Sequence, residues 1–301
     1  MTDLPLDQVR TLLAAVDEGT FDAAARVLHV TPSAVSQRVK ALEQQVGRIL
    51  LLRTKPIRAT ESGEVVIRFA RQLARLERDA SAELGLSDAQ DGEPSRLSIA
   101  VNADSLATWF LPALAAVSAT VNACFDLYRE DQDLTGRLLQ QGQVSAAVTS
   151  SSRPVQGCTV HELGRMRYRA MAAPEFVARR LSHGPLAEVL ADAPVVVFDR
   201  EDDLQDAYLR ALAPGHASPT ARHHIPDSVA YVEAVAAGLG WGMVSHLQAA
   251  TRLVDLSPGR HLDIPLFWQQ WKLDSPVLAA VADAVARAAA LSLLPVESAA
   301  G

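Results

Sequence analysis

The sequence predicts an α/β protein in three parts: a small helical head, one long helix and a larger α/β body. At 301 residues, of which 49 % are hydrophobic, the chain is long enough for more than one buried core. Helical patterns occupy residues 21–47 and about 60–84, whereas strand-like and helical runs alternate after residue 95. A polar stretch with glycine and proline, residues 87–95, lies between them. We therefore expect domains at 1–60, 61–90 and 91–301.

Residues 21–47 predict two helices joined by a tight turn. An Ala-rich helix ends near Leu28, and Thr31 and Pro32 fit the N-cap and first position of a second helix. Apolar residues at helical spacing give the second helix one buried stripe: Val35, Val39, Leu42 and Val46. Small or flexible hydrogen-bonding side chains share the opposite face, and such a face can read base edges in a major groove. The alternative is an ordinary amphipathic helix with a solvated polar face.

The charge distribution favours DNA binding by this head. The whole chain has a net charge of −7, yet residues 26–58 contain seven basic residues and one acid, Glu43. Two short extended pieces, residues 50–54 and 56–60, predict the wing of a winged helix-turn-helix. A basic head on an acidic body fits binding by one end. The predicted DNA contacts are Thr31, Pro32, Ser33, Ser36, Gln37, Arg38, Lys40, Arg53, Lys55 and Arg58.

A long helix is predicted from residue 60 or 61 to about residue 84. Its apolar residues step by 3, 4, 3 and 4, which is typical of a coiled-coil seam: Val66, Phe69, Leu73, Leu76 and Ala80. Charged residues occupy the remaining surface, including Arg68, Arg71, Arg75 and Arg78. The seam predicts a dimer, and a dimer implies two DNA half-sites. The alternative is a helix packed on its own domain.

The body alternates strands and helices, as open α/β sheets do. Strands are expected at residues 97–101, 124–128, 144–149, 168–172, 195–198, 241–245 and 262–268. Helices are expected at residues 106–117, 133–141, 204–212, 229–237 and 276–293. Trp241, Trp268 and Trp271 are expected in the core or at a hinge rather than as stacking platforms.

Over its whole length the chain resembles LysR-type transcriptional regulators. The head carries the resemblance in residues 21–25, 31–38, 42–43 and 58–63 (Phe-Asp-Ala-Ala-Ala, Thr-Pro-Ser-Ala-Val-Ser-Gln-Arg, Leu-Glu and Arg-Ala-Thr-Glu-Ser-Gly). The body is similar to the ArgP/LysG branch, the regulators of basic amino acid export, in residues 97–114, 193–199, 246–248 and 253–259. Residues 223–228 and 238–243 depart from the pattern expected for that branch.

The resemblance implies a body built like the periplasmic binding proteins, from two α/β subdomains around a cleft. We expect one subdomain at residues 91–163 with 262–301, and the other at 164–261. It further implies lysine or arginine as the effector in the cleft and an exporter gene as the target.

Ligands of such folds lie at the carboxyl ends of strands, near helix N-termini. Residues 102–105 follow the first strand of the body, so backbone N–H groups and a serine hydroxyl there can hold an α-carboxylate; the alternative is simple helix capping. Residues 227–228 open another helix and can contact the same α-carboxylate from the second subdomain. The cationic end of a basic effector also needs carboxylate partners. Asp202 and Asp203 are expected to be solvated. The candidate effector residues are Asn102, Asp104, Ser105, Glu130, Asp131, Asp199, Asp227 and Ser228.

Other classes of protein fit the sequence less well. Cys124 and Cys158 form no disulfide framework or metal pattern, the histidines lack ligand spacing, and no nucleophile, P-loop or dinucleotide motif occurs. We expect no enzyme activity, no metal and no cofactor besides the effector. Without a signal peptide or an apolar run near about 18 residues, we expect a cytoplasmic homodimer or homotetramer on a double-stranded operator, with RNA polymerase as a further candidate partner. The competing function is that of a nucleoid protein with low sequence specificity. The sequence disfavours it, because such a protein needs no large α/β ligand-sensing domain.

Overall fold

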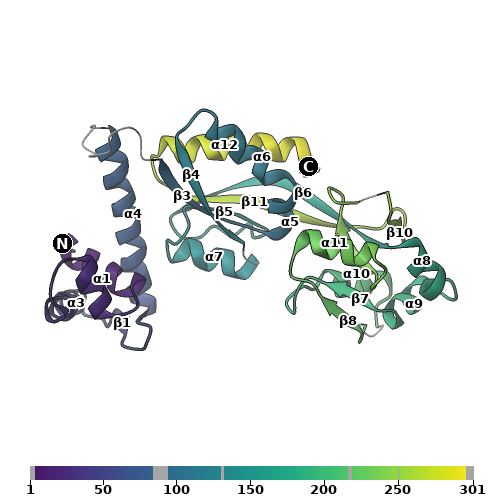
Figure 1. Ribbon diagram of the computed structural model, residues 1–301, viewed down its shortest axis with the longest axis horizontal. Helices are drawn as coiled ribbons and strands as arrows, with labels where there is room; N and C mark the ends of the chain where they lie inside the picture. The colour runs from purple at the N-terminus through teal and green to yellow at the C-terminus, as the bar shows by residue number, and fades with distance from the viewer. Residues whose placement is uncertain (1–3, 84–93, 130–131, 216–218, 250, 296–301) are drawn as a thin grey trace, which may run out of the picture.

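The computed structural model describes residues 4–83, 94–129, 132–215, 219–249 and 251–295. A helical head at the N-terminus is followed by α4 (Glu61–Glu83), which stands beside an elongated body of two lobes (Figure 1). The three predicted parts are therefore present in the predicted order.

The head consists of three helices and a short hairpin. The helices are α1 (Leu6–Asp17), α2 (Phe21–Val27) and α3 (Pro32–Val46), and the hairpin pairs β1 (Leu51–Leu52) with β2 (Arg58–Ala59). Their apolar faces close one core, which also takes in the first turns of α4; it includes Val9, Leu12, Val35, Val39, Leu42, Leu50, Val66 and Ile67. The hairpin is the predicted wing.

The first lobe of the body is built on parallel strands. β3 (Ser95–Val101) lies between β4 (Ala123–Arg129) and β5 (Ala146–Thr149), with Val101 opposite Arg129. Figure 1 shows α6 and α12 on one side of the sheet and α7 on the other. The covering helices are α5 (Ala103–Ser105), η1 (Leu106–Phe110), α6 (Leu111–Ser118), α7 (Gln132–Gln140) and α12 (Pro276–Ser292). Each expected strand and helix of this lobe is present within a few residues.

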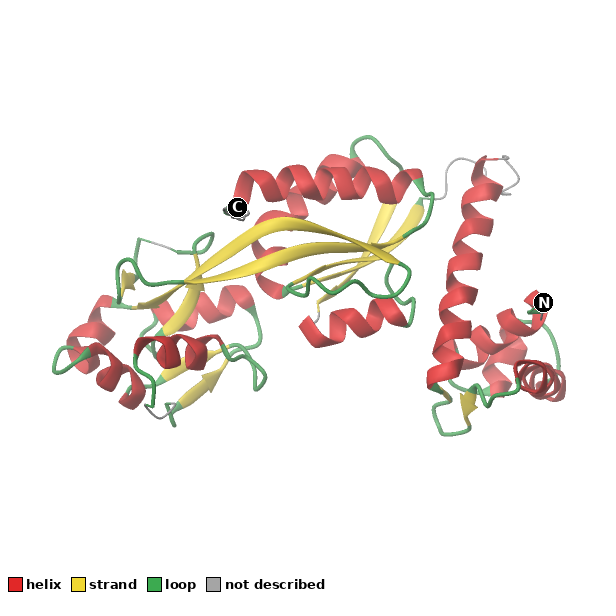
Figure 2. Cartoon of the chain, turned by 180° about the vertical axis from the view of Figure 1, so that it is seen from behind, coloured by secondary structure: helices red, strands yellow, loops and turns green. Residues whose placement is uncertain are grey.

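Two long antiparallel strands join the lobes. β6 (Cys158–Ala172) and β11 (Leu262–Trp271) pair along their length with a register shift between Leu266 and Phe267, and Figure 2 shows them running from one lobe into the other. The predicted subdomain boundary, residues 163/164, falls inside β6. The expected strand began only at Tyr168, because the first half of β6 alternates poorly and exposes polar residues such as His161.

The second lobe has short elements. β7 (Val195–Val197) pairs with β8 (Arg222–His224), while β9 (Gly242–Ser245) and β10 (Val254–Asp255) pair with β6. The helical elements are α8 (Pro174–Phe176), η2 (Val177–Leu181), α9 (Leu186–Asp192), α10 (Leu204–Leu212) and α11 (Ser228–Ala236). Sequence periodicity missed β8, β10, α8, η2 and α9, because two to seven residues are too few to establish a period.

The tryptophans are core residues, as predicted. Trp241 is 0 % exposed, Trp268 2 % and Trp271 3 %. Trp241 and Trp268 belong to the same large apolar cluster, which extends from the first lobe into the second. At these exposures the three rings have no free face on which a ligand or base could stack.

Candidate nucleic-acid interface and ligand cleft

The second helix of the head, α3, begins and ends where its sequence predicts. Thr31 caps it, since its side chain accepts a hydrogen bond from Ala34 N at 3.2 Å, and Pro32 takes the first position. Gly47, at φ +72°, ends the helix in the left-handed conformation. Because both ends are defined locally, the polar face of α3 has a definite orientation on the head.

The polar face of α3 is open to solvent. Ser33, Gln37 and Lys40 are exposed, as are Thr31 and Pro32 at the helix start. Ser36 and Arg38 lie at the margin of this face and are half-buried. The face predicted to read base edges is thus free for a major groove.

The wing adds exposed cations beside α3. Arg53, Lys55 and Arg58 are all exposed on or next to the β1–β2 hairpin. Glu43, the acid of this basic segment, is turned to the backbone: its Oε1 accepts from Leu50 N at 2.8 Å and from Leu51 N at 3.3 Å. The Glu43 carboxylate is therefore occupied by backbone N–H groups at the start of the wing. The positive potential of Arg53, Lys55 and Arg58, which attracts phosphates, is retained.

The apolar stripe of α4 differs from the predicted seam at its first residue. Val66 is only 6 % exposed and lies in the core of the head, so its assignment to the dimer seam is wrong: the first turns of α4 complete the head. Val65 is 53 % exposed instead, in line with Phe69 at 39 % and Leu76 at 43 %. Leu73 is half-buried and Ala80 is exposed. The exposed stripe remains a candidate dimer surface.

The basic face of α4 packs on the body, which the sequence did not predict. Arg75 is 6 % exposed and donates to Ser145 Oγ at 2.6 Å, and Arg71 donates to the carbonyl of Gln141 at 2.6 Å. A Cβ on Gly142 would lie 3.3 Å from the Cα of Arg68, which shows how closely the helix approaches. The expectation that these arginines occupy free surface is therefore wrong. We call this contact the α4–body junction.

Across the cleft between the lobes, Asp104 meets the start of α11. Its Oδ1 accepts a hydrogen bond from Ser228 Oγ, and its Oδ2 accepts from Tyr168 Oη at 2.6 Å. Burial raises the pKa of Tyr168 well above its usual value, and the nearby Asp104 charge raises it further. The structure brings predicted residues from both lobes together. In this structure the Ser228 hydroxyl donates to Asp104, so a ligand carboxylate would have to break that contact to reach it.

A second contact across the cleft involves a residue that the sequence interpretation missed. Arg129 Nη1, at the end of β4, lies 3.7 Å from Asp227 Oδ2. The other oxygen of Asp227 caps α11, accepting from Val229 N at 3.1 Å and Ala230 N at 2.9 Å. A cation at the carboxyl end of a strand is the sequence signal for this contact, whereas a cationic ligand by itself calls only for acids.

Two further predicted residues, buried Ser105 and half-buried Asn102, precede or follow Asp104 in the chain. Ser105 is 0 % exposed. Among the described residues, its Oγ and the Oδ1 of Asn102 are buried without a hydrogen-bond partner. Buried polar atoms are nearly always paired, so these two atoms need a partner, which a water molecule or a bound group at the cleft can supply.

The remaining predicted acids divide into three cases. Asp199 Oδ1 accepts from Glu201 N and Asp202 N at 2.9 Å each, so it shapes the turn after β7. Asp202, expected to be solvated, is half-buried; desolvation raises its pKa, and hydrogen bonds that include one from Phe198 N oppose this rise. That expectation is wrong, because the turn folds its carboxylate back onto the backbone. Glu130 and Asp131 lie outside the described residues.

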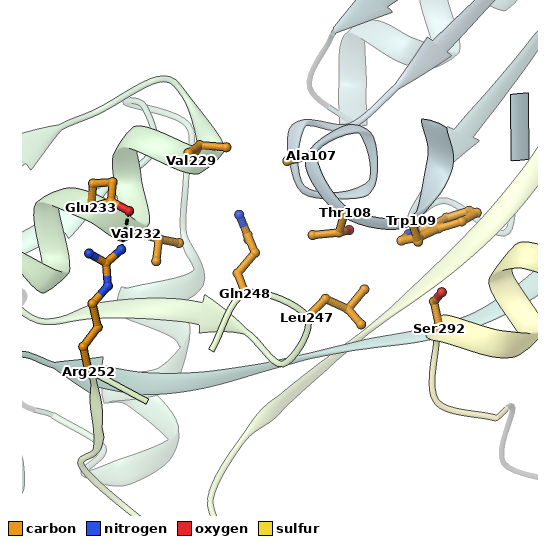
Figure 3. Close-up of a pocket in the computed structure, with 10 residues that line it drawn as sticks. All are labelled: Ala107, Thr108, Trp109, Val229, Val232, Glu233, Leu247, Gln248, Arg252 and Ser292. Atoms are coloured by element: carbon orange, nitrogen blue, oxygen red, sulfur yellow. Dashed lines mark hydrogen bonds and ion pairs between the residues drawn. The ribbon is translucent and has the colours of Figure 1, made fainter. Parts of the chain in front are cut away.

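A pocket of about 440 Å³ lies beside the Asp104–Ser228 contact. Figure 3 shows Gln248 between the two sides of this pocket, and its Nε2 donates to Ser228 Oγ at 3.0 Å. The pocket is lined by Ala107, Thr108, Trp109, Val229, Val232, Glu233, Leu247, Gln248, Arg252 and Ser292. None of the predicted effector residues belongs to this lining, although Ser228 adjoins it. Within the described ranges no cluster of three or more metal-ligating side chains occurs, and no helix is long and apolar enough to span a membrane.

An exposed reading helix with a basic wing, joined to a two-lobed body with a polar cleft, defines a DNA-binding transcription regulator that carries a ligand-sensing domain. Residues 6–64 match the family described as "Bacterial regulatory helix-turn-helix protein, lysR family", and residues 90–290 match the "LysR substrate binding domain". The chain belongs to the LysR family of transcription regulators and is not an enzyme.

Relatives of known name agree over nearly the full length. The chain is 48 % identical over 300 residues to the HTH-type transcriptional regulator LysG of Mycobacterium tuberculosis (strain ATCC 25618 / H37Rv), covering 97 % of this chain and 96 % of the relative. It is 41 % identical over 292 residues to the lysine export transcriptional regulatory protein LysG of Corynebacterium glutamicum, covering 96 % and 99 %.

Solved structures give the same fold. The crystal structure of ArgP from Mycobacterium tuberculosis has a TM-score of 0.87 at 45 % identity, with 96 % of this chain and 98 % of that chain covered. Full-length LysG from Corynebacterium glutamicum with bound effector Arg has a TM-score of 0.84 at 39 % identity, with 97 % and 100 % covered. The chain is thus similar to the ArgP and LysG regulators in both sequence and architecture.

Proposed function

We propose that this regulator senses a basic amino acid, lysine or arginine, and controls the gene of a basic amino acid exporter. The observation that carries the proposal is the likeness, at a TM-score of 0.84, to a regulator solved with arginine bound. The 41 % identity to a lysine export regulator supports the export role. Acidic side chains at the cleft supply the charge that such a ligand requires.

On DNA, the polar face of α3 reads base edges and the wing cations contact phosphates. Support comes from the exposure of Gln37 and Lys40 on α3 and of Arg53 on the wing. The unit is a homodimer, or a homotetramer, held by the exposed stripe of α4, and it covers two half-sites of a double-stranded operator. It works in the cytoplasm without a cofactor other than its effector, and RNA polymerase is a further partner.

In the cleft, the distal cation of the effector is held by one or more of Glu130, Asp131 and Asp199. A desolvated guanidinium or ammonium group must be paired, so removing its carboxylate should weaken binding at least about tenfold. At least one of Glu130→Gln, Asp131→Asn and Asp199→Asn is expected to show this loss while DNA binding without effector stays intact.

Calorimetry with the full-length protein tests the effector. L-Lysine or L-arginine should bind, whereas L-citrulline, which has the shape of arginine without its charge, should bind at least about tenfold more weakly. Footprinting of the promoter of a basic amino acid exporter gene, with and without the bound amino acid, then tests regulation. A protein that binds neither lysine nor arginine at millimolar concentration contradicts the proposed effector.

A further inference from the structure

Two contacts cross the cleft, and both end on the first residues of α11. Asp104 of the first lobe accepts from Ser228, and Arg129 of the first lobe pairs with Asp227 at 3.7 Å. Asp227 and Ser228 are neighbours in the chain. Their partners on the first lobe must therefore lie close to one another.

The sheet explains why an acid and a base meet here. β3 and β4 are adjacent parallel strands in which Val101 lies opposite Arg129. Asp104 follows the end of β3 and Arg129 ends β4, so both lie at the carboxyl edge of the sheet, where ligands of α/β folds bind. The first lobe thus presents one carboxylate and one guanidinium side by side toward the second lobe.

We propose that Asp104 and Arg129 together bind the head group of an α-amino acid, Asp104 taking the ammonium and Arg129 the carboxylate. Both ligand charges are attached to one carbon, so a single head group can meet both side chains. A guanidinium suits a carboxylate because it can donate two parallel hydrogen bonds. The inference deepens the proposed function and rests on its claim that the effector is an amino acid, but it does not require a basic side chain.

Buried polar atoms next to Asp104 provide independent support. Asn102 Oδ1 and Ser105 Oγ are buried and have no hydrogen-bond partner among the described residues. An amide oxygen can accept from an ammonium group, and a hydroxyl can donate to a carboxylate. One zwitterionic head group could therefore satisfy both atoms while it replaces Ser228 on Asp104 and Asp227 on Arg129.

The test compares L-arginine with two analogues by calorimetry on the full-length protein. Agmatine lacks the carboxylate, and 5-guanidinopentanoate lacks the α-ammonium. Each should bind about thirtyfold more weakly than arginine or worse, because a desolvated partner is left unpaired. Arg129→Gln should weaken arginine to a similar degree but leave agmatine unchanged. Asp104→Asn should weaken arginine but leave 5-guanidinopentanoate unchanged.

Two further variants separate ligand binding from a structural role. Asp227→Asn keeps a good helix cap but removes the anion that competes for Arg129, so arginine should bind more tightly. If Arg129 merely tethered the lobes, Asp227→Asn would instead share the loss seen in Arg129→Gln. Arg96→Gln, an exposed arginine on β3, is the matched control and should bind arginine as the parent does.

Several outcomes overturn the inference. If agmatine binds as tightly as arginine, Arg129 does not hold the carboxylate. If Asp104→Asn loses binding of 5-guanidinopentanoate, Asp104 holds the guanidinium of the ligand rather than its α-ammonium. If the parent binds a non-basic amino acid instead, the proposal of a lysine or arginine effector is wrong. The role of Arg129 can then still be tested with the decarboxylated form of that amino acid, as agmatine tests it for arginine. A parent that binds no α-amino acid contradicts both proposals.

Discussion

Replacing Ser145 by alanine is expected to loosen the α4–body junction by about 2 kcal/mol, since a hydrogen bond from a charged donor contributes about 1.5–3 kcal/mol. Ser145 Oγ lies 2.6 Å from Arg75 Nη1, and Arg75 is 6 % exposed. Ser275 Oγ lies 3.5 Å from Nη2, at the long limit of hydrogen bonding, so the contact with Ser145 is the stronger of these two. The variant therefore removes a short hydrogen bond from a guanidinium that is buried at the junction.

Arg75→Met should cost less, about 1 kcal/mol, because it removes the charge together with its desolvation and retains the aliphatic stem. The double variant should cost about as much as Arg75→Met alone, which gives a coupling energy of about 2 kcal/mol between Arg75 and Ser145. Removing the small partner is thus expected to do more damage than removing the large one.

Hydrogen exchange followed by mass spectrometry measures this local opening directly. In Ser145→Ala, amides of α4 and of residues 141–146 should exchange about thirtyfold faster, the equivalent of about 2 kcal/mol. Ser118→Ala, an exposed serine at the end of α6, is the control and should leave these amides unchanged. Unchanged exchange in Ser145→Ala, or a larger effect in Arg75→Met, would refute the account of the junction.

Three further predictions concern the head, the linker and the body. Gln37→Ala should relax specificity at one base pair by about 1–3 kcal/mol, whereas Arg53→Ala should weaken all sequences alike and flatten the salt dependence; equal losses on operator and random DNA would contradict both roles. Leu76→Asp places a charge in the exposed stripe, so size exclusion should show a monomer; a dimer would move the contact elsewhere. Hydrogen bonds from Arg167 lower the pKa of Asp263, so this pair stabilises the folded protein above the unfolded pKa of about 3.9. The melting temperature of Asp263→Asn should therefore lie below that of the parent at neutral pH, and the difference should vanish as pH falls through the lowered pKa; a difference that persists there would exclude this pair as its source.

Local patterns were enough to predict the reading helix. Thr31 and Pro32 define its start, and the spacing of Val35 and Val39 defines its buried face, so all the information lies within two turns of chain. The same holds for β3 and α10, whose apolar residues were sufficient to predict a strand and a helix at these places. By contrast, β10 of the second lobe has only two residues, and its limits follow from pairing with β6 rather than from its own sequence.

The candidate cleft could be predicted only in part. Asp104 and Ser228 were each placed at a helix start by local sequence, and the structure joins them. Their hydrogen bond, however, links residues 124 positions apart, and no local pattern specifies which acid meets which hydroxyl. For the same reason Arg129 was missed: its partner Asp227 is evident only once the two lobes face one another.

The sequence by itself determined the helix caps, the periodic faces and the segregation of charge into a basic head and an acidic body, because these depend on residues that are neighbours in the chain. Only the tertiary structure decided which face of α4 each domain covers. Val66 and Val65 are adjacent and equally apolar, yet the head buries one and leaves the other exposed. Arg75 is as basic as the surface arginines of α4, yet the body encloses it. Packing between distant segments selects among chemically equivalent positions, and that selection has no local signature.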